Sequence, residues 1–248
     1  MKTIRIIILS GLILWISACD ESDYNYSSDT SSETGTGGSL ARFAIAGNYL
    51  YTVDYSKLKT FDISDEKNPS LLGEIYVNQN AETIFAKGDL LFLGTQLGVY
   101  IYDISDPAAP QYISQYSHVQ SCDPVVVHGN YAYSTLNSDG PCGRGLNELD
   151  IIDISNPRNP DLVRVIDMNS PRGLGISGSL LFVCDESLQV FDITDPTDPD
   201  PIKYIDIDAV DVIPIDTLLL IATEQGLAEY SIDAGHDIHY LSSLYSIQ

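Results

Sequence analysis

The nine residues "YDISDPAAP" (102–110) decide how this chain folds, because the chain repeats them. In this phrase one Asp precedes Ile-Ser, a second Asp precedes Pro, and another Pro follows three residues later. A phrase that returns along a chain predicts a repeat architecture, in which each copy is one structural unit. The other copies are "FDISDEKNP" (61–69), "IDISNPRNP" (152–160), "FDITDPTDP" (191–199) and a fainter "YSIDAGHDI" (230–238).

A second marker upstream of each phrase fixes the length of the repeat. It is a turn-forming pair followed by Tyr or Leu, at 47–49, 88–90, 129–131, 178–180 and 216–218. The marker precedes the phrase by 14 or 15 residues (47 to 62, 88 to 103, 178 to 192) except in the third copy (129 to 153), where the interval is 24 residues. The chain therefore holds five repeats of about 40 residues. Their bounds are about 41–78, 79–118, 119–168, 169–207 and 208–248.

Each repeat reads as four short β-strands. The strands are rich in β-branched and aromatic residues and are bounded by Gly, Asn, Asp and Pro. Gly-Asn or Gly-Asp forms the tight turn after the first strand, and the Pro residues end the third strand because Pro cannot donate to a strand ladder. No stretch has a sustained helical period. In the second repeat we expect strands at 82–86, 90–95, 98–104 and 111–117.

Four-stranded units of this length, arranged around an axis, form a β-propeller. The stretches "VYIYDISDPAAP" (99–110), "LDIIDISNPRNP" (149–160) and "LQVFDITDPTDP" (188–199) resemble the LVIVD repeat family, which comprises bacterial secreted or lipid-anchored propellers. The resemblance covers residues 41–248. We therefore predict an all-β, five-bladed β-propeller with four antiparallel strands per blade. Its fifth blade is degenerate, because the fifth repeat lacks the Gly, the first Asp and the Pro pair.

The N-terminal segment is distinct from the repeats. Basic "MKTIR" precedes apolar "IIILSGLILWIS", which is too short for a comfortable membrane span, and Ile16-Ser17-Ala18-Cys19 resembles a bacterial lipobox. We predict a lipoprotein signal peptide at 1–18 and lipidation of Cys19; the alternative is an ordinary secretory signal with an incidental Cys. Residues 19–40 are polar and rich in Ser, Thr, Gly and Asp, and predict a flexible tether that spans roughly 25 Å.

The charge of the chain limits its partners. It has 35 acidic and 12 basic residues and a formal net charge of −23. Such a chain offers no broad surface that neutralises phosphates, so we expect no nucleic-acid partner and no electrostatic docking on anionic lipid. The expected membrane contact is the lipid on Cys19. We expect a monomer in the bacterial cell envelope, outside the cytoplasm, with the outer membrane or cell surface favoured.

Strand order assigns the loops of a propeller to two faces. The first face carries the turns between strands one and two and between strands three and four, which include the repeated phrase. The second face carries the loops between strands two and three and the connections between blades. Because its loops vary most, we expect a ligand there; the alternative is a solvated rim of mutual ion pairs. The candidate residues are Arg42, Tyr55, Glu82, Asp123, Arg172, Asp211 and, in the insertion 136–148, Arg144.

Cysteine placement suggests one disulfide. Cys122 and Cys142 both map to the second face, where a bond between them would fix the insertion in an oxidising compartment. The alternatives are two free thiols or a site for a soft metal. Cys184 occupies a strand position that is small in the other repeats, which favours a buried, inert thiol.

Catalytic motifs are not evident in this sequence. It contains no nucleophile elbow, P-loop or dinucleotide fingerprint. The repeated Asp residues lack the graded spacing of a calcium loop, so turn or inter-blade hydrogen bonds are favoured over calcium. Tyr49, Tyr51, Tyr131 and Tyr133 recur at fixed strand positions, which favours packing between blades over a carbohydrate platform. We expect no metal and no cofactor.

These observations favour a non-catalytic lipoprotein that binds a protein or glycan partner through its second face. One alternative is a propeller hydrolase or lyase with carboxylates or a metal at the channel mouth. A second alternative is a structural scaffold of an envelope assembly. The charged residues at the channel mouth are mixed in sign and poor in His, and this favours the binding protein over the enzyme.

Overall fold

The computed structural model of the chain describes residues 38–118, 124–138 and 146–245. These residues form eighteen β-strands. No helix in this part of the chain has the length and apolar character needed to cross a membrane. The strands are β1 (Phe43–Ala46), β2 (Tyr49–Asp62), β3 (Ser70–Lys87), β4 (Leu90–Thr95), β5 (Gly98–Asp103), β6 (Gln111–Ser117), β7 (Val125–His128), β8 (Tyr131–Leu136), β9 (Glu148–Asp153), β10 (Asp161–Asp167), β11 (Leu174–Ser177), β12 (Leu180–Cys184), β13 (Leu188–Asp192), β14 (Asp200–Ile205), β15 (Ala209–Ile215), β16 (Leu218–Thr223), β17 (Gly226–Ile232) and β18 (Ile238–Tyr245).

The strands form antiparallel sheets that follow the repeats. Three sheets have four strands each, in the orders β10-β9-β8-β7, β11-β12-β13-β14 and β15-β16-β17-β18. The first two repeats share a six-stranded sheet, β1 to β6. Residues 70–76 of β3 pair with β2, whereas residues 81–87 pair with β4, so one long strand ends the first repeat and begins the second. The prediction of four-stranded antiparallel units is confirmed for the third, fourth and fifth repeats, and the bounds of β4, β5 and β6 match the expected strands closely.

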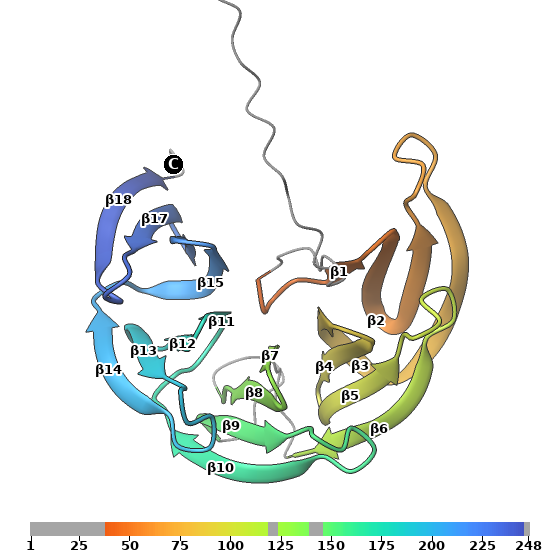
Figure 1. The fold of residues 1–248 in the computed structure, drawn as a ribbon, viewed down its shortest axis with the longest axis horizontal. Coiled ribbons are helices and arrows are strands. Elements are labelled where there is room, and N and C mark those ends of the chain that lie inside the picture. The colour runs from red at the N-terminus through yellow and green to blue at the C-terminus, as the bar shows by residue number, and fades with distance from the viewer. Residues whose placement is uncertain (1–37, 119–123, 139–145, 246–248) are drawn as a thin grey trace, which may run out of the picture. The chain divides into compact units, whose positions relative to one another are not determined.

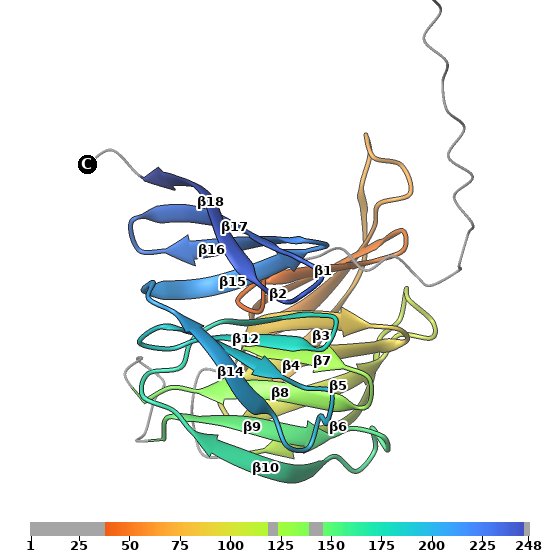
Figure 2. The ribbon, with the colours of Figure 1, turned by 60° about the vertical axis from the view of Figure 1, so that its left-hand side comes forward.

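The sheets are arranged around a common centre (Figure 1). The strands β7, β11 and β15 lie innermost, and β6, β10, β14 and β18 lie outermost. Viewed from another side, the sheet of β11 to β14 lies between its two neighbours in sequence (Figure 2). None of the sheets closes on itself, and no strand pairing among the described residues joins β15–β18 to β1 or β2.

The core is divided into four apolar layers, each between two successive repeats. Alternate residues of a strand point to opposite sides, so the middle strands of each sheet are buried on both faces. Each fully buried large apolar side chain stabilises the fold by about 1.5–3 kcal/mol. The layers contain, in order, Tyr51, Leu58 and Leu93; Phe92, Ile101 and Val125; Tyr133, Ile151 and Leu181; and Phe182, Val212 and Ile221.

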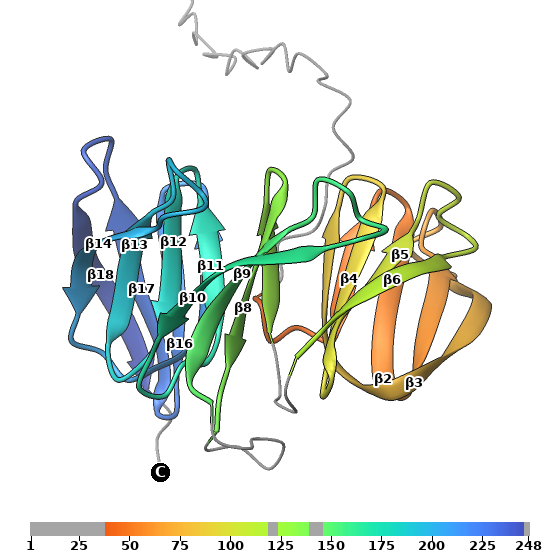
Figure 3. The same cartoon turned by 90° about the horizontal axis from the view of Figure 1, so that it is seen from below.

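The repeated phrase forms two consecutive Asx turns. In the second repeat the carboxylate of Asp103 accepts a hydrogen bond from Ser105 N at 2.8 Å, and that of Asp106 accepts one from Ala108 N at 3.2 Å. The first, third and fourth repeats make the same pair of bonds. Hydrogen bonds from Ser105 hold the pKa of Asp103 below its usual range. The phrase therefore recurs because each third strand must end and turn in one geometry, and its turns all project from the first face (Figure 3).

The fifth repeat reaches a similar turn with different residues. Ser231 stands where the other repeats have the first Asp. The carboxylate of Asp233 instead accepts hydrogen bonds from Gly235 N at 2.8 Å and Asp237 N at 2.9 Å. The turn residue His236 has a φ of 64°. The repeat is thus divergent in sequence, and β17 and β18 still pair across this turn.

Tyrosine hydroxyls connect two pairs of successive repeats. Tyr51 Oη donates to the Pro107 carbonyl oxygen at 2.8 Å, from the first repeat to the phrase of the second. Tyr133 Oη donates to the Pro196 carbonyl oxygen at 3.4 Å, from the third repeat to the phrase of the fourth. Burial raises the pKa of Tyr51 to about 12. The prediction that these recurrent tyrosines pack between repeats is confirmed for both residues.

Candidate functional site

The second face gathers five of the candidate residues that the structure describes: Arg42, Tyr55, Glu82, Arg172 and Asp211. They do not form one continuous ring. The structure joins Arg42 to Tyr55, pairs Arg172 with a residue outside the candidate set, and buries Asp211. The other predicted residues lie outside the described part of the chain; they are Cys19, Cys122, Asp123, Cys142 and Arg144.

Arg42 and Tyr55 form a cation–π pair at the edge of the first repeat. The Arg42 guanidinium carbon lies 5.1 Å from the centre of the Tyr55 ring. Tyr55 occupies a bend within β2, with a φ of 45°, and 56% of its surface is exposed. Val53 N donates to the Arg42 carbonyl oxygen at 2.9 Å, which fixes the backbone beside the ring. Such a pair contributes about 0.5–1 kcal/mol at an exposed site, so the two side chains are held together before any partner binds.

The second face also carries exposed apolar side chains. Leu40, Phe43, Tyr55 and Leu97 are all exposed, by 37% to 56%. The four turns of the repeated phrase on the first face, at 62–69, 103–110, 153–160 and 192–199, carry no exposed large apolar side chain. The exposed apolar side chains of the second face therefore have no counterpart in these four turns.

Arg172 pairs with Asp208 on the fourth and fifth repeats. Arg172 Nη1 lies 3.2 Å from Asp208 Oδ1, and both side chains have substantial exposure. Arg172 N donates to the Cys184 carbonyl oxygen at 2.7 Å, which places the Arg172 backbone beside the end of β12. Asp208 also lines a cavity of about 240 Å³ together with Glu224 and Tyr245. Such an ion pair contributes little to stability in water, so these groups remain available to a ligand.

Glu82 lies at the second-face side of the second repeat, where a neighbouring side chain holds its carboxylate. Its carboxylate accepts a hydrogen bond from Gln96 Nε2 at 3.3 Å, and Gln96 belongs to the turn between β4 and β5. Glu82 and Gln96 also make further interactions. Glu82 is half-buried. The structure therefore presents it as a positioned carboxylate on the rim of the second face.

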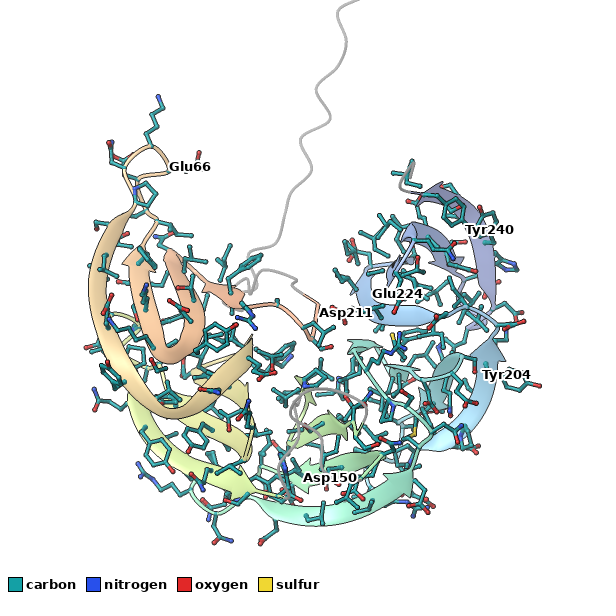
Figure 4. All side chains as sticks on the ribbon, turned by 180° about the vertical axis from the view of Figure 1, so that it is seen from behind. Glu66, Asp150, Tyr204, Asp211, Glu224 and Tyr240 are labelled. Carbon is teal, nitrogen blue, oxygen red and sulfur yellow. The ribbon has the colours of Figure 1, made fainter. Side chains whose placement is uncertain are left out.

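Asp211 is buried and bound by residues of its own chain. Its carboxylate accepts hydrogen bonds from Ser39 Oγ at 3.0 Å, Val212 N at 3.0 Å and Leu40 N at 3.4 Å. Burial raises the pKa of Asp211, and the hydrogen bonds oppose that rise. Figure 4 shows Asp211 near the centre of the arrangement, beside the segment that precedes β1. A Cβ on Gly173 would lie 2.2 Å from its carboxylate, so this glycine permits the close approach.

The segment 38–41 crosses the centre of the sheets at the second face. Ser39 Oγ accepts from Leu174 N at 2.7 Å while it donates to Asp211, so it bridges β11 and β15. Ile84 N of β3 donates to the Ala41 carbonyl oxygen at 3.0 Å. Gly38 and Ser39 are buried. Sequence reasoning placed residues 38–40 in the tether and missed Ser39, because a Ser beside two glycines carries no sign of a buried partner.

Two further titratable side chains, Cys184 and His239, contact residues of the folded domain. Cys184 is a buried free thiol whose pKa burial raises far above the usual range, in accord with the expected inert role. His239 Nε2 lies 3.3 Å from Asp233 Oδ2 in the turn of the fifth repeat. Among the described residues, no group of three or more His, Cys, Asp and Glu side chains is placed to hold a metal ion.

Comparison with known proteins identifies the repeat. The family model described as "LVIVD repeat" matches residues 37–77, 79–118, 142–167 and 171–203, which together exceed half of the chain. No curated protein matches the chain by sequence.

Solved structures share the architecture. A functionally unknown protein from Desulfotomaculum acetoxidans superposes with a TM-score of 0.67 and 9% identity, covering 87% of this chain and 70% of that one. The periplasmic gluconolactonase PpgL from Pseudomonas aeruginosa gives a TM-score of 0.63 and 13% identity, with 80% and 68% covered. A Lactobacillus plantarum protein gives 0.66 and 14%, with 81% and 69% covered. At these identities the likeness establishes the propeller-like fold, and the activity of a neighbour does not carry over with it.

Proposed function

The chain belongs to the LVIVD repeat family, and from this premise we propose that it is a non-catalytic binding module that holds a protein partner on its second face. The observation that carries the proposal is the preformed Arg42–Tyr55 pair, on a face that also exposes Leu40, Phe43 and Leu97. Tyr and Arg are the residue types that dominate the binding energy of protein interfaces. Exposed apolar side chains around them supply area that a partner removes from water.

The rigid setting of this patch favours binding. Arg42 and Tyr55 already contact each other, so a partner does not bear the full entropy cost of ordering them, which is about 0.5–1.5 kcal/mol for each rotamer-rich side chain. The Arg172–Asp208 pair and Glu82 add polar groups at other points of the same face. A protein partner suits an apolar centre with a polar rim better than a glycan does, because glycans present mainly hydroxyl groups.

We also propose a blade count for the propeller and a cellular location for the protein. We propose that the sheets are five blades, one for each repeat, and that the fifth blade is the divergent one. We also propose that Cys19 carries lipid and anchors the domain in the bacterial cell envelope, outside the cytoplasm, as a monomer. The leader-like residues 1–18 and the polar residues 19–37 support this anchor.

An enzymatic role is the second candidate. The likeness to a gluconolactonase favours it, since that enzyme uses a propeller-like fold. The cavity bordered by Asp208 and Glu224 offers carboxylates to a small substrate. Turnover of gluconolactone or another lactone by the purified protein, lost in Glu224→Gln, would establish this candidate in place of the binding module.

Affinity capture with matched variants tests the binding module. The full-length protein is used to capture partners from solubilised envelopes, and the bound proteins are quantified by mass spectrometry. We expect a defined protein whose recovery falls at least tenfold with Arg42→Ala/Tyr55→Ala. Lys67→Ala, in a first-face turn, is the control and should leave recovery unchanged. Recovery that is equal for the two variants, or that is competed by free glycans alone, would contradict a protein site on the second face.

A further inference from the structure

The innermost strands enclose a cavity of about 270 Å³ that the binding proposal does not use. It is bordered by β3, β7, β11 and β15, which contribute apolar walls. The strands β7, β11 and β15 are each the last in their sheet, so one backbone edge of each lies outside the strand ladder and supplies N–H and C=O groups at the centre. The wall residues are Phe85, Val126, Leu174, Ile176, Val212 and Pro214.

One end of this central cavity is covered by the chain itself. The hydrogen bonds of Ser39 to Asp211 and Leu174, and of Ala41 to Ile84, carry residues 38–41 across the second-face ends of the inner strands. The inner strands run in the same direction, each from the second face to a tight turn on the first face. A ligand therefore reaches the cavity from the first face.

Two basic side chains border the cavity at that open end. Lys87 is the last residue of β3 and His128 is the last residue of β7, each directly before a tight turn, and both line the cavity. Lys87 is exposed and His128 is half-buried. Among the described residues, neither takes part in an ion pair or a side-chain hydrogen bond.

Lys87 adds a positive charge in a chain whose formal net charge is −23, and the ring of His128 adds a hydrogen-bond donor beside it. Basic groups beside an apolar cavity attract an anion, and an ammonium group hydrogen-bonds a carboxylate strongly. The neighbouring tight turns carry Asp89 and Asp216, whose negative charge disfavours a polyanion such as a phosphate ester. The charges therefore suit a ligand with a single carboxylate.

We propose that the central cavity binds a small organic monocarboxylate. Its carboxylate lies at Lys87 and His128, and its body lies between the apolar walls. At about 30 Å³ for each water-sized group, a volume of about 270 Å³ holds about nine non-hydrogen atoms. Gly175 sets the width of the cavity: a Cβ there would lie 2.6 Å from Pro214 Cδ, so β11 and β15 approach closely only because this residue is glycine.

Isothermal titration of the full-length protein with benzoate and benzamide tests this proposal. The two probes have the same number of non-hydrogen atoms and differ in charge. We expect benzoate to bind at least tenfold more tightly than benzamide, as a charge-assisted hydrogen bond requires. Lys87→Met keeps the aliphatic stem and should weaken benzoate at least tenfold, whereas Lys67→Met, away from the cavity, should not.

Two results would overturn the monocarboxylate site. One is benzoate affinity no greater than that of benzamide, or no benzoate binding to the folded protein. The other is an equal loss of benzoate binding in Lys87→Met and Lys67→Met. The Arg42→Ala/Tyr55→Ala variant should bind benzoate with unchanged affinity. The monocarboxylate site and the second-face protein site can therefore be tested separately.

Discussion

Replacing Ser39 with Ala should destabilise the whole domain, because one hydroxyl group links strands that are far apart in sequence. Ser39 Oγ donates to the buried carboxylate of Asp211 at 3.0 Å and accepts from the buried N–H of Leu174 at 2.7 Å. The substitution removes a hydrogen bond to a charged group, worth about 1.5–3 kcal/mol, and leaves a buried donor unsatisfied, which costs about 1–3 kcal/mol. Asp211 keeps its bond from Val212 N.

Because these two terms overlap, we expect the free energy of unfolding to fall by about 2–4 kcal/mol. A domain of this size loses about 2–4 °C of melting temperature for each kcal/mol, so a loss of about 3 kcal/mol lowers Tm by about 6–12 °C. Urea unfolding followed by circular dichroism measures the first quantity, and a thermal scan measures the second.

Ser177→Ala is the matched control for this measurement. Ser177 is also at the end of an inner strand, and its hydroxyl donates to the Asp216 carbonyl oxygen at 3.3 Å in an exposed setting. We expect it to change stability by less than about 0.5 kcal/mol. If Ser39→Ala and Ser177→Ala have equal effects, then residues 38–41 do not fasten the inner strands and the reasoning is refuted.

Three other changes are expected from the same structure. Tyr51→Phe should cost about 1 kcal/mol of unfolding free energy by urea titration, since its hydroxyl bonds Pro107 between repeats, whereas Tyr49→Phe should cost less. The first aspartate of each repeated phrase has a lowered pKa; these residues are Asp62, Asp103, Asp153 and Asp192. Their carboxylates therefore stabilise the fold at neutral pH, and this contribution is lost as the pH falls below about 4. Asp→Asn at these positions keeps the acceptor of the Asx turn and should reduce the loss of stability in acid unfolding curves. Cys19→Ala should abolish incorporation of labelled palmitate and release the protein from membranes, and retention of both would contradict the lipid anchor.

The sequence predicts the architecture well because the repeated residues form turns through local hydrogen bonds. Asp103 and Asp106 form their Asx turns with residues only two positions away, so local sequence suffices to place them. The strands on either side follow from alternating apolar residues that must be buried between sheets. The divergence of the fifth repeat is also visible in the sequence, although the role of Asp233 in its turn is not.

The candidate site is less predictable because its contacts are long-range. Ser39 and Asp211 are 172 positions apart, and no periodicity or motif signals that they meet. Arg172 was expected on the second face, but its partner Asp208 belongs to a different repeat. Lys87 and His128 lie before ordinary tight turns, and only the arrangement of β3 beside β7 brings them to one cavity. Such pairings depend on how the sheets pack against one another, which a single sequence does not specify.

Site-specific photocrosslinking in intact cells tests whether a protein partner occupies the second face. A photoreactive phenylalanine derivative replaces Tyr55 on the second face or, as the control, Lys67 on the first face. We expect one discrete protein adduct after illumination of the Tyr55 variant and none for the Lys67 variant. The absence of an adduct at Tyr55, or the same adduct from both positions, would contradict a binding site on the second face.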